Sequence, residues 1–210
     1  MSTKQETPIA TNGSKLPKVI SPSKLAHVVL RTGQFEAMFQ FYKVFLGAEE
    51  AFNNGELGFL RYDDEHHRIA IAGLPNILPK DPTSSGLWHV AFTFDSLEDL
   101  LKAYAQRKAH GILPSWCVNH GPTTSMYYFD PDGNQIESQI DNYDDPLDAD
   151  RYMRSSSYKE NPIGVNFDPE VLIGMLEEGA DAEKLKMRID IGPKDFQDIP
   201  QRILPVEKVE

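Results

Sequence analysis

The sequence is poor in cysteine and in basic residues, and both shortages restrict what the protein can be. Its single cysteine, Cys117, excludes an internal disulfide and a cysteine-rich zinc site. Only 21 Lys and Arg residues stand against 32 Asp and Glu, which gives a formal net charge of −11. A surface of this sign repels phosphate backbones and anionic lipid, so we expect no nucleic-acid partner and no membrane partner.

Long apolar runs are missing as well. No stretch approaches the ~18 consecutive apolar residues of a membrane-spanning helix, and the polar N-terminus has no apolar core of a secretory signal. We therefore expect a soluble, cytoplasmic protein. What the chain does contain is the composition of an ordinary globular domain, because 40% of its 210 residues are hydrophobic and 25% are charged.

The order of expected elements occurs twice along the chain. Each time a strand is followed by an amphipathic helix and then by three shorter strands. The first set is expected at residues 24–32, 35–47, 49–53, 57–62 and 68–74, and the second at residues 86–94, 96–108, 112–118, 123–129 and 134–140. The pattern predicts an α+β fold of two tandem βαβββ modules, residues 24–75 and 86–140, joined by a proline-rich linker.

The two ends of the chain differ from this repeat. Residues 1–22 have few large apolar groups and are predicted to form a disordered tail ahead of a domain at residues 23–143. Residues 141–150 are acidic and are expected to be irregular. The remaining extension, residues 144–210, contains one predicted short helix, at residues 168–179, and is too thin for a second core. We expect it to wrap over the main domain or over a partner subunit.

Two histidines stand at equivalent points of the repeats and draw attention to a third polar side chain. His27 and His89 each lie within an apolar strand, and a two-fold relation between the modules would bring both to one central point. Strand alternation places Glu137 on the polar face of the last strand. A histidine in such a strand is usually a hydrogen-bonded core residue, and Glu137 could simply face water. Together, two His and one carboxylate form the facial triad that binds non-haem Fe(II) and leaves three positions open.

The doubled module with His27, His89 and Glu137 resembles the vicinal oxygen chelate superfamily, which includes glyoxalases, bleomycin-resistance proteins and extradiol dioxygenases. The resemblance covers residues 24 to about 143. It implies that the two modules pair into an open mixed β-barrel around a metal ion, with the C-terminal extension outside it. The three residues above would be the metal ligands.

Three further segments are similar to those of type I extradiol ring-cleavage dioxygenases. They are Glu65-His-His-Arg-Ile-Ala-Ile-Ala72, Asn119-His-Gly-Pro122 and Ser125-Met-Tyr-Tyr-Phe-Asp-Pro-Asp-Gly-Asn134. The resemblance makes His67 an acid–base catalyst, and it assigns to His120 and Tyr127 the positioning of the substrate hydroxyl. It implies Fe(II), alternatively Mn(II), as the cofactor, and a catechol-type molecule and O₂ as substrates. We also expect a homodimer, from the extension and from the tendency of this fold to pair.

Several alternatives remain open at this point. His67 with its neighbour could be a solvated turn pair, and Tyr127 could be an ordinary strand aromatic, since only one of two adjacent tyrosines can face a cavity. Glyoxalase-like isomerases and epimerases add a fourth ligand from the last strand of the first module, but residues 68–73 offer no carboxylate. Thiol transferases share the His, His, Glu set and do not need His67, His120 and Tyr127. A metal-free binding or resistance protein would have no reason to keep His27, His89 and Glu137 together.

Overall fold

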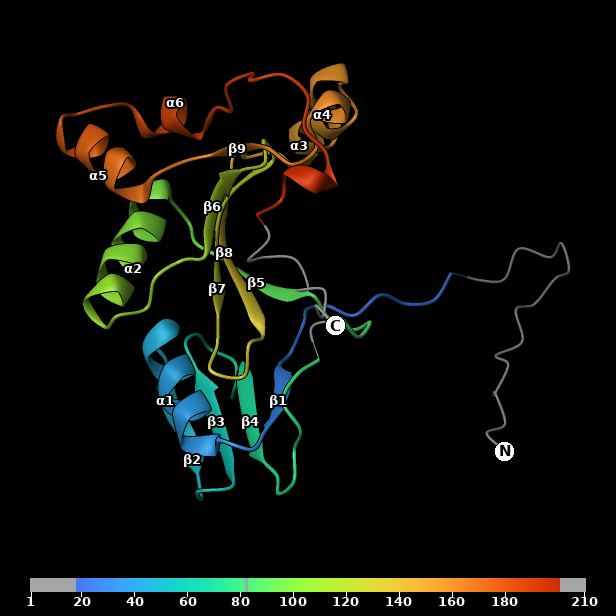
Figure 1. Cartoon of the computed structure of the whole chain (residues 1–210), viewed down its shortest axis with the longest axis vertical. Coiled ribbons are helices and arrows are strands. Elements are labelled where there is room, and N and C mark those ends of the chain that lie inside the picture. Colours follow the sequence, from blue (N-terminus) through green and yellow to red (C-terminus); the bar gives the residue numbers. More distant parts are fainter. Residues whose placement is uncertain (1–17, 82, 201–210) are drawn as a thin grey trace, which may run out of the picture.

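The computed structural model describes residues 18–81 and 83–200, in which two modules are followed by a mainly helical extension (Figure 1). The predicted tail therefore lies, up to residue 17, outside the described residues. The first module contains β1 (Val28–Thr32), α1 (Phe35–Phe45), β2 (Glu49–Asn53), β3 (Leu57–Arg61) and β4 (Ile69–Gly73). The second contains β5 (His89–Thr93), α2 (Leu97–Ala109), β6 (Trp116–Asn119), β7 (Thr123–Phe129) and β8 (Gln135–Asp141).

Each module forms one mixed sheet with the same connectivity. The strand orders are β1-β4-β3-β2 and β5-β8-β7-β6, and a short strand of the extension, β9 (Val165–Asn166), pairs with β6. β1 is parallel to β4 and β5 is parallel to β8, whereas the other pairs are antiparallel. The predicted α+β order of two βαβββ units is confirmed.

The helices of both modules are buried in one common core. Phe45 of α1 packs edge-on against Tyr128 of β7, with ring centroids 5.0 Å apart. Arg107 of α2 lies over the Phe45 ring and donates a 2.8 Å hydrogen bond to the Phe45 carbonyl. The hydroxyl of Tyr42 donates to the Asp130 carboxylate across the same boundary, at 3.0 Å. The two modules are therefore joined through their helical layers.

This packing differs from the expected barrel. Because α1 and α2 lie on the same side of the two sheets (Figure 1), the opposite sheet faces both point away from the shared core. We call these the open faces of the first and second module. Within the described part of one chain the sheets do not close into a barrel around a common centre. The open barrel around a metal ion expected from the sequence is thus not formed by the described residues of a single chain.

The two repeat histidines lie at the beginning of their strands and not in the middle. β1 starts one residue after His27, and β5 starts at His89. The residues ahead of them, including Leu25 and Leu87, are exposed. Ahead of β1, the Arg68 side chain binds the carbonyls of Leu25 and Ala26 in place of a neighbouring strand. The apolar character of these segments therefore extended the predicted strands too far.

The extension contains more regular structure than expected. Its helices are α3 (Pro146–Met153), α4 (Ser156–Glu160), α5 (Pro169–Glu177) and α6 (Ala182–Lys186), and a 3₁₀ turn follows at Phe196–Asp198. The expectation of an irregular segment at 141–150 and of one helix in the extension was wrong. The extension does lie over the main domain, because Ile163 and Ile199 pack against Trp116, Val118 and Tyr127. None of the helices in the described residues has both the length and the apolar character needed to cross a bilayer.

Candidate active site

The open face of the second module carries a buried cluster around Glu137. In β8, Glu137 is paired with Tyr127 of β7 and with Ala91 of β5, so their side chains share one face of the sheet. His89, two residues before Ala91, reaches the same point from the neighbouring strand. Its Nε2 atom lies 3.0 Å from Glu137 Oε2, and the Glu137 residue is only 5% exposed.

A chain of close contacts continues from Glu137 to the extension. The Tyr127 hydroxyl donates to Glu137 Oε1 at 3.1 Å, and its oxygen also lies 3.0 Å from His120 Nε2. On the other side of the ring, His120 Nδ1 is 2.6 Å from the carbonyl oxygen of Ile163. Tyr127 has one proton for two possible acceptors, so it bonds either the carboxylate or the imidazole at a given time.

Burial and hydrogen bonding set the charge states of this cluster. Burial acts to raise the pKa of Glu137, but hydrogen bonds from His89 and Ser125 and the nearby histidines outweigh it and hold that pKa below its usual value. Burial and the Glu137 charge raise the pKa of the Tyr127 hydroxyl. Burial lowers the pKa of His120, against the opposing effect of its bond to Ile163. At neutral pH the cluster therefore holds an ionised carboxylate, a protonated phenol and a neutral imidazole.

The first module carries the remaining predicted residues on its own open face. The His67 ring stacks on the rings of His27 and Phe59, and each of these centroids lies 4.5 Å from that of His67. The exposed ring of His66 lies 4.4 Å from that of His67. Burial and the neighbouring histidines lower the pKa of His67. His67 is thus a member of a stacked aromatic group, and it lies beside His27 on the first module.

The structure therefore divides the six predicted site residues into two groups. His89, Glu137, Tyr127 and His120 are together on the second module, whereas His27 and His67 are together on the first. Among the described residues there is no set of three His, Cys, Asp or Glu side chains placed to hold a metal ion. Two of the expected ligands converge, and the third does not join them. A three-ligand metal site does not fit within one chain.

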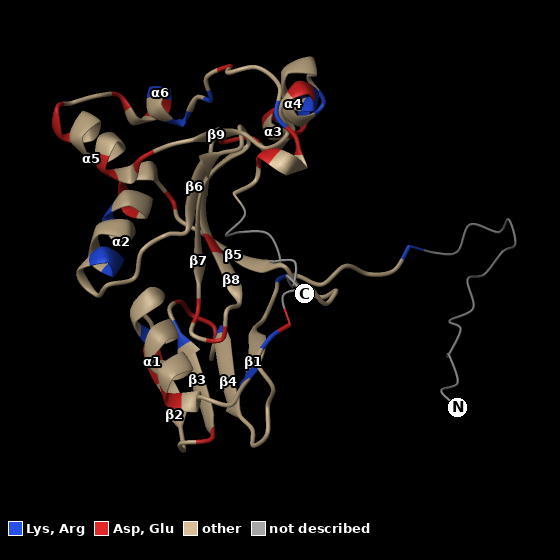
Figure 2. Ribbon diagram, viewed as in Figure 1, with Lys and Arg blue, Asp and Glu red and all other residues tan. Residues whose placement is uncertain are grey.

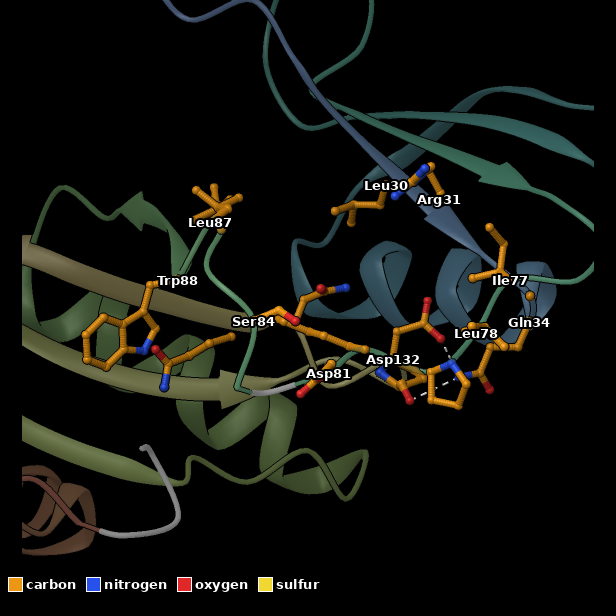
Figure 3. Close-up of a pocket in the computed structure, with 18 of the residues that line it drawn as sticks. Leu30, Arg31, Gln34, Ile77, Leu78, Asp81, Ser84, Leu87, Trp88 and Asp132 are labelled. Carbon is orange, nitrogen blue, oxygen red and sulfur yellow. Dashed lines mark hydrogen bonds between the residues drawn. The ribbon is translucent and has the colours of Figure 1, made fainter. Parts of the chain in front are cut away.

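A cavity of about 770 Å³ lies between the modules (Figure 3), and its lining does not include His89, Glu137, Tyr127 or His120. Leu87 and Trp88, just ahead of β5, line one part of it, and Gln34 donates a 2.6 Å hydrogen bond to Asp132 at its far end. Gln135 also lines the cavity, and its buried side-chain nitrogen and oxygen have no hydrogen-bond partner among the described residues. Gln135 precedes Glu137 by two residues on the same strand face, about 7 Å away.

Sequence reasoning missed the contribution of the extension to this cluster. The Ile163 group that contacts His120 is a main-chain carbonyl. Every residue has such a carbonyl, so no pattern of side chains in the sequence predicts this contact. Arg188, which donates to the carbonyl of His120 at 3.1 Å, lies 68 residues away from it. The stacking of Trp116 on Tyr127, with centroids 5.2 Å apart, could have been found, because the two positions face each other in a hairpin.

Comparison with known proteins places these observations in context. The sequence profile of the Glyoxalase/Bleomycin resistance protein/Dioxygenase superfamily matches residues 24–138. Biphenyl-2,3-diol 1,2-dioxygenase 2 of Rhodococcus globerulus is 45% identical over 163 residues, which are 77% of this chain and 86% of that protein. Biphenyl-2,3-diol 1,2-dioxygenase 3 of the same organism is 42% identical over 167 residues, 79% of this chain and 88% of the relative. The crystal structure of a glyoxalase/dioxygenase from Nostoc punctiforme covers 60% of this chain and 98% of its own, with 23% identity and a TM-score of 0.48.

Proposed function

Because the chain belongs to the Glyoxalase/Bleomycin resistance protein/Dioxygenase superfamily, we propose that it opens the ring of a catechol-type diol with O₂, at a bond next to the hydroxylated carbons. The observation that carries this proposal is the 45% identity to a biphenyl-2,3-diol 1,2-dioxygenase across 77% of the chain. The chain is an extradiol ring-cleavage dioxygenase, and its substrate is a small aromatic diol. The cavity between the modules, which Gln135 of β8 lines, is of a size that suits such a molecule.

The proposed cofactor is Fe(II), with Mn(II) as the alternative, held by His89, Glu137 and His27. These two imidazoles and one carboxylate would hold the ion, and the bound ion would supply the electron density for oxygen activation. His89 and Glu137 support this assignment, since their donor atoms lie 3.0 Å apart and point to one place. The third ligand needs a different source, because the His27 of the same chain lies on the first module, packed on His67 and away from His89 and Glu137.

A second copy of the chain is that source in our proposal. The helices of one chain bury the same side of both sheets, so its two open faces point outward and cannot face each other. A two-fold axis would lay the first module of each chain over the second module of the other, which is the self-complementary arrangement of a C2 dimer. On the first module's open face Val29 is 54% exposed and Phe52 is 44% exposed. This dimer would cover that apolar surface and form two equivalent sites.

The remaining residues would act on the bound diol. His67 would arrive with His27 from the second copy, and as a histidine it can accept the proton released by the diol and return it later. His120, neutral and half-buried, would face the substrate hydroxyl together with Tyr127. Because Tyr127 keeps its proton, it serves as a donor that holds an oxygen atom in place and not as a base.

The activity is tested by loading the protein with Fe(II) without oxygen and then measuring oxygen uptake with a panel of catechols. We expect uptake of O₂ and a yellow hydroxymuconic-semialdehyde-type product. The same iron-replete sample should not turn over a hemithioacetal or a thiol substrate. Turnover of either substrate without oxygen uptake from any catechol would instead assign the chain to the isomerases or thiol transferases of the superfamily.

A further inference from the structure

The His120 ring and main chain are both held by segments that come more than 40 residues later in the sequence. The His120 N–H bonds the Thr123 carbonyl at 2.9 Å within the local turn. Its ring instead meets the carbonyl of Ile163, and its own carbonyl accepts a hydrogen bond from Arg188. The extension therefore fixes two separate atoms of one residue of the proposed site.

One guanidinium links these two contacts. Besides the His120 carbonyl, Arg188 Nη1 donates to the Asn161 carbonyl at 2.6 Å, and Nη2 donates to the Ser157 carbonyl at 3.3 Å. The guanidinium carbon also lies 5.4 Å from the centre of the Tyr152 ring. Asn161 begins the turn that presents Ile163. Arg188 thus ties the main chain of His120 to the turn whose carbonyl meets the His120 ring, and its planar fork of donors can bind several carbonyls at once.

The turn itself leaves little freedom for the Ile163 carbonyl. The Asn161 side chain accepts a 2.7 Å hydrogen bond from the Gly164 N–H. Gly164 has φ +107°, and a Cβ at this position would lie 2.2 Å from the Asn119 carbonyl oxygen. The turn therefore sits against the residue just before His120, and Asn161 and Ile163 are both buried. The position of the Ile163 oxygen relative to the imidazole is set by these contacts.

This geometry decides which ring nitrogen of His120 carries the proton. A carbonyl oxygen can only accept, so the 2.6 Å contact with Ile163 requires a proton on Nδ1. In the neutral ring the Nε2 lone pair is then free and faces the Tyr127 oxygen. A ring with the opposite tautomer would place two acceptors against each other at Ile163.

We propose that Arg188 is a positioning residue that, through the Asn161–Gly164 turn, holds His120 as the Nδ1–H tautomer with its Nε2 lone pair directed at Tyr127 and the substrate. The proposal rests on the function proposed above, because it assigns the C-terminal extension to the catalytic centre. It makes the extension a part of the site and not a separate cover.

The tautomer is measured without metal or substrate, so this result is independent of the dioxygenase activity. In protein with ¹⁵N-labelled histidine, the long-range ¹H–¹⁵N spectrum distinguishes the two tautomers, and His120→Gln identifies the signals of this ring. We expect Nδ1–H for His120 in the wild type and a mixture of tautomers in Arg188→Met. An Nε2–H ring in the wild type, or an unchanged Nδ1–H ring in the variant, would overturn the proposal.

The kinetic test is a double-mutant cycle with the iron-loaded enzyme. Arg188→Met should lower kcat by about 10- to 100-fold, the range that a displacement of roughly 1 Å can cause. In the His120→Ala background the same substitution should cost little more, because the group on which it acts is gone. An independent loss of equal size in both backgrounds would show a general structural effect and contradict the assignment.

Matched variants keep the result interpretable. Arg154→Met removes an exposed arginine of the same extension, paired with Asp150, and should change neither kcat nor the His120 spectrum. Arg188→Lys keeps the charge without the planar fork, and we expect an intermediate kcat. If Arg188→Met does not fold, the cycle is run with Arg188→Lys, and full activity of this variant together with an unchanged spectrum would also contradict the proposal.

Discussion

The Tyr127 hydroxyl lies between the ionised Glu137 carboxylate and the neutral His120 imidazole. Without this hydroxyl the two groups lose the contact that links them. We predict that Tyr127→Phe lowers kcat by about 10- to 100-fold, since the substrate loses one positioned donor. The loss of a buried hydrogen bond should also lower the free energy of unfolding by about 1 kcal/mol. Steady-state kinetics of the iron-loaded enzyme and denaturant unfolding measure the two effects.

The neighbouring tyrosine provides the control. Tyr128 belongs to the common core, where its hydroxyl lies 3.6 Å from the Met126 sulfur, on the opposite face of β7. Tyr128→Phe should affect stability and leave kcat unchanged. Equal kinetic losses in the two variants would indicate a general disturbance of β7, and the specific function of Tyr127 would then be wrong.

The histidines of the two groups should respond differently to removal. His89→Ala takes away a donor atom that faces Glu137 at 3.0 Å, so we predict that it loses the metal itself. His67→Ala should keep the metal and lose most turnover, by about 100-fold or more, because it removes an acid–base group and not a ligand. Metal analysis beside kcat separates the two outcomes.

His66 is the matched control for His67. It is the adjacent residue in the same turn and its side chain is 69% exposed. His66→Ala should retain both metal and turnover. If His67→Ala released the metal as His89→Ala does, His67 would have to be counted among the ligands.

At the scale of elements, the Glu170 carboxylate of α5 links this helix to α2, beside the apolar contacts of α5 with the core. Glu170 accepts hydrogen bonds from Tyr104, at 2.6 Å, and from Lys108, at 2.5 Å. The Lys108 bond and then the Tyr104 bond lower the pKa of Glu170 below its ordinary 4.5. A carboxyl group with a depressed pKa stabilises the folded state above its ordinary pKa, and this stabilisation is lost as the pH falls through the folded value.

We therefore predict a pH-dependent difference between the wild type and Glu170→Gln. Hydrogen exchange of the α5 amides should be slower in the wild type at pH 7, and the difference should close as the pH falls below the ordinary pKa of Glu170. Glu177→Gln, at the exposed end of the same helix, should show no such difference. If the difference in exchange rate between the wild type and Glu170→Gln persisted unchanged at low pH, the charge of Glu170 would not be what stabilises α5.

Local signals in the sequence predicted the elements well where they depend on neighbouring residues. The helix α2 begins after Ser96, whose hydroxyl accepts a hydrogen bond from the Asp99 N–H. The helix α5 begins after Asp168, whose carboxylate accepts from the Glu170 N–H. The same Asp-Pro signal occurs at Asp145, where α3 begins, although the acidic composition there favoured an irregular segment. That helix was predictable from its N-cap, and composition was the weaker guide.

What the sequence does not contain is the choice of faces that pack together. Alternation places Glu137 on the face of β8 that points away from Ile136 and Ile140, as the structure has it, because strand periodicity is a local property. It does not say that α1 of the first module packs on Tyr128 of the second and so turns both open faces outward. That decision depends on contacts between residues such as Tyr42 and Asp130, 88 positions apart.

At the scale of the whole molecule, charge and shape both bear on association. The chain carries a net charge of −11, and Figure 2 shows acidic positions on both modules and along the extension. Two such chains repel at long range, so we expect their association to depend on the apolar open faces and to strengthen with salt. In the dimer proposed above, each site takes His27 from one chain and takes His89 and Glu137 from the other.

This arrangement makes complementation between two inactive variants possible. His27→Ala and His89→Ala should each be inactive as pure proteins. In a mixed dimer, one of the two sites would combine intact His27 from one chain with intact His89 and Glu137 from the other, while the second site would contain both substitutions. Random assembly forms mixed dimers in half of the cases, so co-expression should restore about one quarter of the wild-type turnover.

A second pair of variants distinguishes shared sites from other causes of recovery. His89→Ala and Glu137→Gln lie on the same module, so every site of their mixed dimer keeps one defect and no turnover should return. Light scattering should show a dimer for each protein. Recovery by the first pair alone requires that ligands come from two chains, because a site formed within one chain remains defective in every combination. A monomer, or the absence of recovery from a confirmed mixed dimer, would contradict the shared site.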